Sequence, residues 1–150
     1  MTHCTHPLPP SLPSHVARQP HWSDQYKGRP WCEDQDCLWW FRLWSREHFG
    51  RECPDCFIDH ARTVFSAARL LRDEPRVMDT FGYAPTQQPR EGDAVSLTRG
   101  QAAHHIGMVV ELGGRILILH ALEHMGVVRS SMLDLRSMFW AITGYWRYVR

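Results

Sequence analysis

The stretch "HIGMVVELGGRILILHAL" (105–122) is the clearest indication of the fold class. Its two halves, 105–112 and 115–122, are runs of apolar and β-branched residues of strand length. Gly113-Gly114 stands between them, and two glycines that join such runs indicate a tight β-hairpin. We therefore expect two antiparallel neighbours, in which residues with numbers that sum to about 227 lie opposite each other.

The sequence on either side of this hairpin extends the domain. Further short runs have strand character at 93–98, 126–131 and 143–150. Upstream, apolar residues recur at helical spacing from Cys37 to a glycine cap at Gly50, and again over about 56–73, where Pro75 is expected to end the helix. The stretch 132–141 fits a short helix. Helices followed by an antiparallel sheet of about five strands predict an α+β domain.

The N-terminal segment differs from the rest of the chain. Residues 1–21 contain five prolines and four histidines without a hydrophobic period. Proline fixes its own backbone and cannot donate a hydrogen bond, so such a stretch is poorly suited to a core. We expect 1–21 to be an extended arm and 22–150 to be a single domain.

Composition argues against two classes of partner. The net charge is +1, without the basic stripe that marks a nucleic-acid-binding surface. No apolar run approaches the roughly 20 residues that span a bilayer, so we expect no membrane-spanning segment. We also expect no secretion signal, because the N-terminus lacks the apolar core that such signals need.

Cys37 stands where a thiol can be made reactive. It would begin a helix capped by Asp36 or Asp34, where free backbone N–H groups and the helix dipole favour a thiolate, whereas the carboxylates oppose it. In the expected hairpin register, His105 and His120 fall on one face of the sheet. A cysteine with two histidines in reach is a nucleophile, a base and an orienting group.

The same three residues also fit a purely structural interpretation. A lone buried cysteine commonly behaves as a small hydrophobic residue. A histidine on a strand is commonly structural or partly exposed. Residue types and spacing alone leave both interpretations open.

Several motifs follow one another in the order of a known family. They are Gly28-Arg29-Pro30-Trp31, Asp36-Cys37, "LWSREHFG" (43–50), Cys53-Pro54-Asp55-Cys56, "EGDAV" (91–95), "HIGMVV" (105–110) and "LHALEHMGVVRS" (119–130). Over about residues 22–150 the chain resembles NlpC/P60 cysteine peptidases, in particular those encoded near the tail genes of phages and prophages.

The resemblance implies a fold and a set of roles. The fold would be papain-like, with N-terminal helices packed on a small antiparallel sheet. Cys37 would be the nucleophile, His105 the general base and His120 the residue that orients it, with no cofactor required for catalysis. Trp31 and Asp36 would contact substrate, although Trp31 replaces a tyrosine of the family. The reaction would hydrolyse amide bonds of peptidoglycan stem peptides, commonly between D-glutamate and a diamino acid.

The remaining cysteines permit three interpretations. Cys53 and Cys56 form a Cys-x-x-Cys pair, which together with Cys32 and Cys4 could supply four thiolates to a structural zinc ion or an iron–sulfur cluster. His3 or His6 could replace Cys4. Alternatively the thiols are free, or Cys32 forms a disulfide with Cys53 or Cys56.

Two functions from different classes follow. The first is an endopeptidase carried by a phage tail, present in the virion or in the host cytoplasm during assembly, which acts on the cell wall in the periplasm. The second is a structural tail-tip or tail-assembly protein that keeps the fold and docks on tail-tip or hub proteins through its arm and aromatic surface. A small metal-binding adaptor would rest on the cysteines alone.

Overall fold

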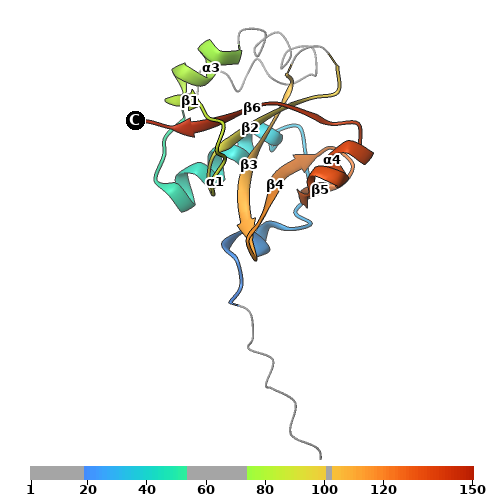
Figure 1. Ribbon diagram of the computed structural model, residues 1–150. Helices are drawn as coiled ribbons and strands as arrows, with labels where there is room; N and C mark the ends of the chain where they lie inside the picture. Colours follow the sequence, from blue (N-terminus) through green and yellow to red (C-terminus); the bar gives the residue numbers. More distant parts are fainter. Residues whose placement is uncertain (1–18, 54–73, 101–102) are drawn as a thin grey trace, which may run out of the picture.

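The structure is a computed structural model that describes residues 19–53, 74–100 and 103–150. Its helices are η1 (Trp22–Tyr26, a 3-10 helix), α1 (Cys37–Phe49), α3 (Glu74–Thr80) and α4 (Met132–Ser137). Its strands are β1 (Tyr83–Pro85), β2 (Ala94–Thr98), β3 (His105–Leu112), β4 (Arg115–Leu122), β5 (Gly126–Ser130) and β6 (Ala141–Tyr148). The predicted α+β class is confirmed (Figure 1).

The strands form one six-stranded antiparallel sheet in the order β1-β6-β2-β3-β4-β5. The hairpin register is the predicted one, since Met108 pairs with Leu119. The expectation of about five strands missed β1, a short edge strand that within the described residues pairs with β6 alone. Pro85 had indicated a loop there, but an edge strand tolerates proline because its outer side needs no ladder hydrogen bonds.

Helix α1 has a defined start and a defined end. The Asp36 carboxylate accepts the backbone N–H of Trp39 at 2.9 Å, so it is the N-cap. Gly50 has a φ of 62° and ends the helix in the left-handed conformation, which glycine adopts without strain. The predicted limits of this helix are therefore confirmed.

One face of the sheet packs against α1. The helix contributes Trp40, Phe41 and Trp44, which are at most 5% exposed. They lie in one cluster with Ile106 and Met108 of β3. Burial of rings this large is worth roughly 2–3 kcal/mol each, so the tryptophan-rich sequence after Cys37 anchors α1 on the sheet.

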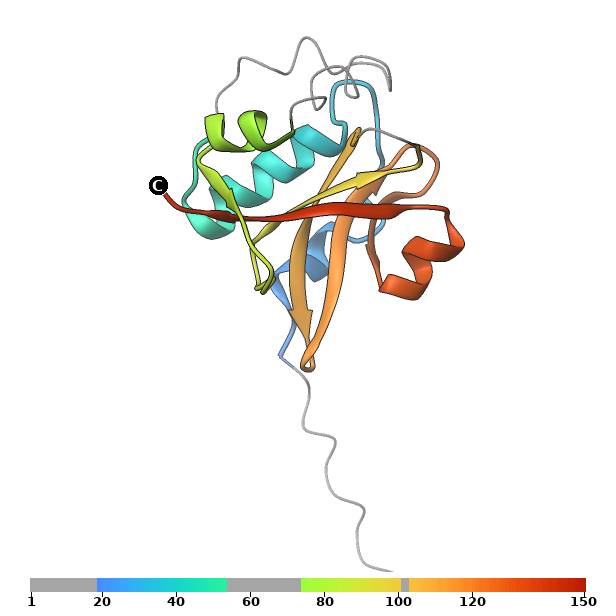
Figure 2. The same cartoon turned by 45° about the horizontal axis from the view of Figure 1, so that its top comes forward.

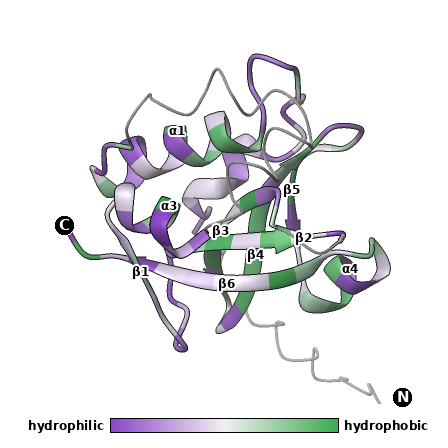
Figure 3. Cartoon of the chain, turned by 90° about the horizontal axis from the view of Figure 1, so that it is seen from above, coloured by the Kyte–Doolittle hydropathy of each residue, from purple (hydrophilic) through white to green (hydrophobic). Residues whose placement is uncertain are grey.

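The opposite face of the sheet packs against α4. A second cluster contains Val109, Ile118, Leu135 of α4 and Trp140. Neighbouring residues along a strand point to opposite faces, which is why β3 and β4 supply both clusters. Figure 3 shows α1 and α4 on the two sides of the sheet.

The two ends of the β3–β4 hairpin lie far apart. The turn at Gly113-Gly114 lies at the end of the sheet near which the described chain begins (Figures 1 and 2). His105 and Leu122 mark the other end, because β3 begins at His105 and β4 ends at Leu122.

Some expectations are wrong, and others concern residues outside the described chain. Pro75 does not end a helix, but is the second residue of α3, where its missing N–H is not needed. The helix expected at 56–73 and most of the arm lie outside the described residues. His21, assigned to the arm, joins the domain, since its ring caps η1 and lies 3.1 Å from Glu91. No helix of the described part is long and apolar enough to cross a membrane.

Candidate active site

Cys37 is the first residue of α1, and backbone hydrogen bonds hold the loop that leads to it. The N–H of Gly28 donates to Val127 of β5, and Val127 donates back to Arg29, both at 2.9 Å. The N–H of Gln35 donates to the Cys32 carbonyl at 2.9 Å. The position of the thiol is thus fixed from the sheet as well as from the helix.

The thiol of Cys37 lies against the beginning of β3. The backbone N–H groups of Ile106 and Leu38 and of Cys37 itself approach it and favour the thiolate. Two larger effects oppose them, namely burial of the thiol and the negative charge of Asp36. Although Cys37 is only half-buried as a residue, these effects raise the pKa of its thiol to about 12. Cys37 is therefore a neutral thiol at neutral pH.

His105 and His120 contact each other directly. Nε2 of His105 lies 2.9 Å from Nδ1 of His120, and both residues are buried. At this end β3 pairs with β2, because Leu97 lies opposite His105, whereas the pairing of β3 with β4 begins at Met108. The two rings therefore contact each other beyond the last backbone pair of β3 and β4. The predicted placement of both histidines on one face is confirmed.

Ser130 extends the pair to three groups. Its Oγ lies 2.8 Å from Nε2 of His120, and only 2% of Ser130 is exposed. One set of tautomers satisfies the whole chain: His105 donates from Nε2 to His120, and His120 donates from its own Nε2 to Ser130. Nδ1 of His105 then remains as a proton acceptor.

Both imidazoles are held neutral. Burial, followed by the charge of His120 and then of His104 and Arg99, lowers the pKa of His105 well below its usual value. Burial, followed by the charge of Arg99, lowers the pKa of His120 to about 4. A neutral imidazole is the form that can accept a proton, so the pair is in the basic form at neutral pH.

The thiol and the imidazoles approach β3 from different sides. His105 and Val109 lie on the face that packs against α4, whereas Cys37 belongs to α1 on the other face. The thiol meets the backbone N–H of Ile106, the residue that follows His105 in β3. The hydrogen bonds of the described residues do not include one between the Cys37 thiol and His105.

Trp140 and Arg99 lie beside the histidine pair. The Trp140 ring stacks on His105, with 4.6 Å between centroids and 28° between planes. The Arg99 guanidinium lies 4.4 Å from the centroid of the Trp140 ring. These contacts bring a cation close to two neutral imidazoles.

The two residues expected to bind substrate have visible structural roles. Asp36 caps α1, and burial raises the pKa of its carboxyl group. Trp31 is half-buried and packs against the α1 cluster. Both lie on the segment that leads into Cys37, so their positions near the thiol agree with the sequence, while contact with substrate stays a prediction.

The cysteine hypotheses are tested only in part. Cys32 is exposed, Cys53 is buried, and both are free thiols, so the alternative of a Cys32–Cys53 disulfide is wrong. Cys4 and Cys56 lie outside the described residues. Among the described residues no group of three or more His, Cys, Asp or Glu side chains could hold a metal ion. The four-thiolate site therefore stays a prediction.

Sequence reasoning missed Ser130, Trp140 and Arg99. The sequence does hold a signal for Ser130. It lies on the strand that follows the strand of His120, two residues beyond Val128, which pairs with His120, so it is a diagonal neighbour of His120. Trp140 comes from the connection between α4 and β6, whose position relative to His105 depends on the whole sheet.

No family model, curated protein or solved structure matches this chain.

Proposed function

We propose that the protein is a cysteine endopeptidase of papain-like fold that hydrolyses amide bonds in peptidoglycan stem peptides. The observation that carries the proposal is the buried chain from His105 through His120 to Ser130, at the beginning of the strand against which the Cys37 thiol lies. The resemblance of 22–150 to NlpC/P60 peptidases supports the substrate, a bond between D-glutamate and a diamino acid.

The reaction is an acyl transfer in two steps. The thiol of Cys37 gives its proton to Nδ1 of His105 while Sγ bonds to the carbonyl carbon. The C–N bond then breaks, and the amine leaves with that proton. Water, losing a proton to the same imidazole, hydrolyses the thioester and restores the thiol. His120 holds the ring of His105 throughout, because it occupies Nε2.

The protonation states set the order of events. A thiol with a pKa raised to about 12 and imidazoles with lowered pKa values are all neutral at pH 7, so the proton moves as Cys37 attacks. Catalytic hydrogen bonds are often long before substrate binds. We expect substrate to bring the thiol and Nδ1 of His105 within hydrogen-bonding distance.

Backbone N–H groups would stabilise the negative charge that develops on the substrate oxygen in the transition state. Those of Ile106, Leu38 and Cys37 approach the thiol, and we expect them to donate to the carbonyl oxygen under attack as it gains negative charge. In other acyl-transfer enzymes the loss of one such donor lowers kcat by about 10²–10³. The start of a helix offers these donors because its first N–H groups lack partners within the helix.

Digestion of purified peptidoglycan tests the proposal. Wild type should release fragments with a new amino group on the diamino acid, identified by mass spectrometry. Cys37→Ala should release none while keeping the wild-type circular dichroism spectrum. His105→Ala should lose about as much activity as Cys37→Ala, because nucleophile and base act as a unit. Wild-type rates in folded Cys37→Ala protein would refute the mechanism.

A docking role on a phage tail is supported by a separate observation. Met132 and Leu133 of α4 and Phe139 shortly after it are exposed apolar residues, and Leu133 and Phe139 are 73% and 83% exposed. Phe139 has a φ of 63°, a conformation that costs a bulky residue free energy and directs its ring outward. If docking is the function, Leu133→Ser should reduce incorporation of the protein into tail particles and leave hydrolysis unchanged.

A further inference from the structure

The turn that ends α4 has an unusual residue at its centre. The N–H of Trp140 donates to the carbonyl of Leu135 at 2.9 Å, and the N–H of Phe139 donates to that of Arg136 at 3.1 Å. These two bonds form a Schellman motif, in which the position of Phe139 is left-handed and is usually taken by glycine. Phe139 has a φ of 63°. A bulky residue is disfavoured in this conformation, so the surrounding structure must compensate for it.

The compensation does not come from the side chain of Phe139, which is 83% exposed. It comes from the next residue, because Trp140 is only 9% exposed. Trp140 belongs to the same buried cluster as Leu135, which is the apolar contact that a Schellman motif favours. The strained turn therefore serves to bury the ring of Trp140.

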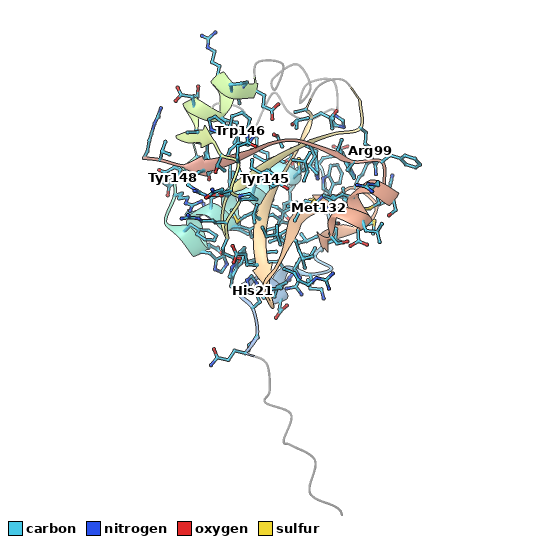
Figure 4. The ribbon with its side chains drawn as sticks, in the orientation of Figure 1. His21, Arg99, Met132, Tyr145, Trp146 and Tyr148 are labelled. Carbon is cyan, nitrogen blue, oxygen red and sulfur yellow. The ribbon has the colours of Figure 1, made fainter. Side chains whose placement is uncertain are left out.

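The buried ring of Trp140 lies on the histidine pair. It stacks on His105 with 4.6 Å between centroids, and its centroid is 5.2 Å from that of His104. The Arg99 guanidinium lies over the same indole. Figure 4 shows Arg99 at the rim of the molecule, on the same side as Met132 of α4. The indole thus contacts both the buried imidazole and an exposed arginine at this rim.

A ring stacked on an imidazole restricts it in two ways. It opposes rotation about the Cβ–Cγ bond, because a rotated imidazole would collide with the indole. Since Nε2 of His105 is held by His120 at 2.9 Å, a fixed ring plane also fixes the direction of Nδ1. The indole also excludes water from this side of the histidine pair, and a hydrogen bond is stronger in a dry environment.

We propose that Trp140 is a positioning residue for the proposed base, and that the strained turn after α4 seats its ring on His105. The indole holds the imidazole plane so that Nδ1 is directed at Cys37, and it keeps water from the hydrogen bond between His105 and His120. This inference rests on the proposed hydrolase function. Misplacement of a catalytic group by about 1 Å can lower a rate about 100-fold, so loss of the ring should be visible in kcat.

Substitutions of Trp140 test this role with a soluble peptidoglycan stem peptide as substrate. Trp140→Leu should lower kcat about 10- to 100-fold and change KM little, because the ring acts on the base and not on the substrate. Trp140→Phe keeps an aromatic ring on His105 and should recover much of the rate. Trp22→Leu is the matched control and should behave as wild type, because Trp22 makes a similar stack on a different histidine, His48, at 4.3 Å.

The pH dependence separates positioning from general packing. Burial is the largest cause that lowers the pKa of His105. Trp140→Leu admits water to the imidazole, so this pKa should rise and the acidic limb of the kcat/KM profile should move to higher pH. Trp140→Phe should move it less. The charged and titratable groups around His105 stay the same in both variants, namely His120, His104 and Arg99, with Cys37 and Asp36 at the start of α1.

Two substitutions of Phe139 test the turn itself. Both Phe139→Gly and Phe139→Val remove the exposed ring, but glycine adopts a positive φ without strain, whereas a β-branched residue does not. Phe139→Gly should raise the urea midpoint and keep the wild-type kcat. Phe139→Val should lower kcat while circular dichroism shows a folded protein, because Trp140 leaves its position on His105. Equal kcat values in the two variants would show that the turn does not seat the ring.

Nuclear magnetic resonance separates this inference from the proposed hydrolysis. The proton between His105 and His120 should give a slowly exchanging signal in wild type and Trp140→Phe, and should exchange faster in Trp140→Leu. If no protein cleaves the peptide but these signals behave as stated, hydrolysis is refuted and the positioning of His105 stands. If exchange and the pKa of His105 are the same in Trp140→Leu and wild type, the positioning role is refuted. Equal losses of kcat in Trp140→Leu and Trp140→Phe, without a shift of the pH profile, would also refute it.

Discussion

Ser130 decides how His120 is held, because it is the partner of the second nitrogen of that ring. Ser130→Ala would leave a buried N–H without an acceptor. We expect it to lower the free energy of unfolding by about 1–3 kcal/mol and to slow hydrolysis. Urea denaturation and peptidoglycan digestion measure the two effects. Ser137→Ala, at an exposed serine of α4, serves as the control, and equal stability of the two variants would contradict the contact.

The buried histidines make stability depend on pH. In the unfolded chain each binds a proton near pH 6.5, whereas in the fold the pKa of His120 is lowered to about 4. Below pH 6.5 the unfolded state therefore binds more protons, and stability falls as the pH falls. Between pH 7 and 4 this one group should account for a loss of about 3 kcal/mol.

A non-titrating variant isolates that loss. His120→Gln keeps polar atoms at the site but cannot gain the proton, so its free energy of unfolding should fall less steeply between pH 7 and 4. His124→Gln, at an exposed histidine, should keep the wild-type slope. Identical slopes in both variants would show that His120 is not the group that titrates.

At the scale of the element, α1 depends on Asp36 for its start and also carries the charge of Asp36 next to the thiol. Asp36→Asn should keep the cap, since asparagine caps as well as aspartate, and should lower the pKa of Cys37. Asp36→Ala should instead lower the free energy of unfolding by about 1 kcal/mol. We expect faster alkylation of Cys37 by iodoacetamide in Asp36→Asn, followed by peptide mass spectrometry over a range of pH.

Exposed Cys32 gives the internal reference for that experiment, because its peptide reports reagent concentration in the same sample. Only the ratio of Cys37 to Cys32 labelling should rise. A ratio that is unchanged or reduced in Asp36→Asn would mean that the carboxylate does not govern the thiol.

The elements differ in how much of them the sequence predicts. The hairpin register followed from Gly113-Gly114, because turn chemistry is local, and it correctly brought His105 and His120 together. Strand β1 was missed because Pro85 looks like a loop residue until its edge position is known. Local sequence signals thus predict the individual helices and strands, whereas the order of the strands depends on the whole sheet.

At the scale of the whole molecule, Gly126 joins the segment before Cys37 to the sheet. A Cβ at this position would collide with the carbonyl oxygen of Arg29, and the φ of 69° is itself unfavourable for other residues. Gly126→Ala should therefore strongly lower the thermal unfolding temperature. Gly100→Ala, where a Cβ meets nothing within 4 Å and φ is not positive, is the matched control and should change it little. Similar unfolding temperatures for both would contradict this packing.

The candidate site shows the same division between local and global information. Cys37 and its cap were predictable from a helix start, and the histidine pair from a register. Trp140 and Arg99 were not, because they reach His105 from the connection before β6 and from the end of β2. Their approach depends on which strands are neighbours, and β6 lies beside β2 only in the folded sheet.

The stacking of Trp140 on His105 has an optical consequence. A protonated imidazole quenches the fluorescence of an indole that it touches, while a neutral one quenches it much less. The emission of Trp140 therefore follows the charge on His105, and the difference between wild type and Trp140→Phe isolates that signal from the other six tryptophans. The protein carries a built-in probe with which a proton arriving on this ring can be observed without any label.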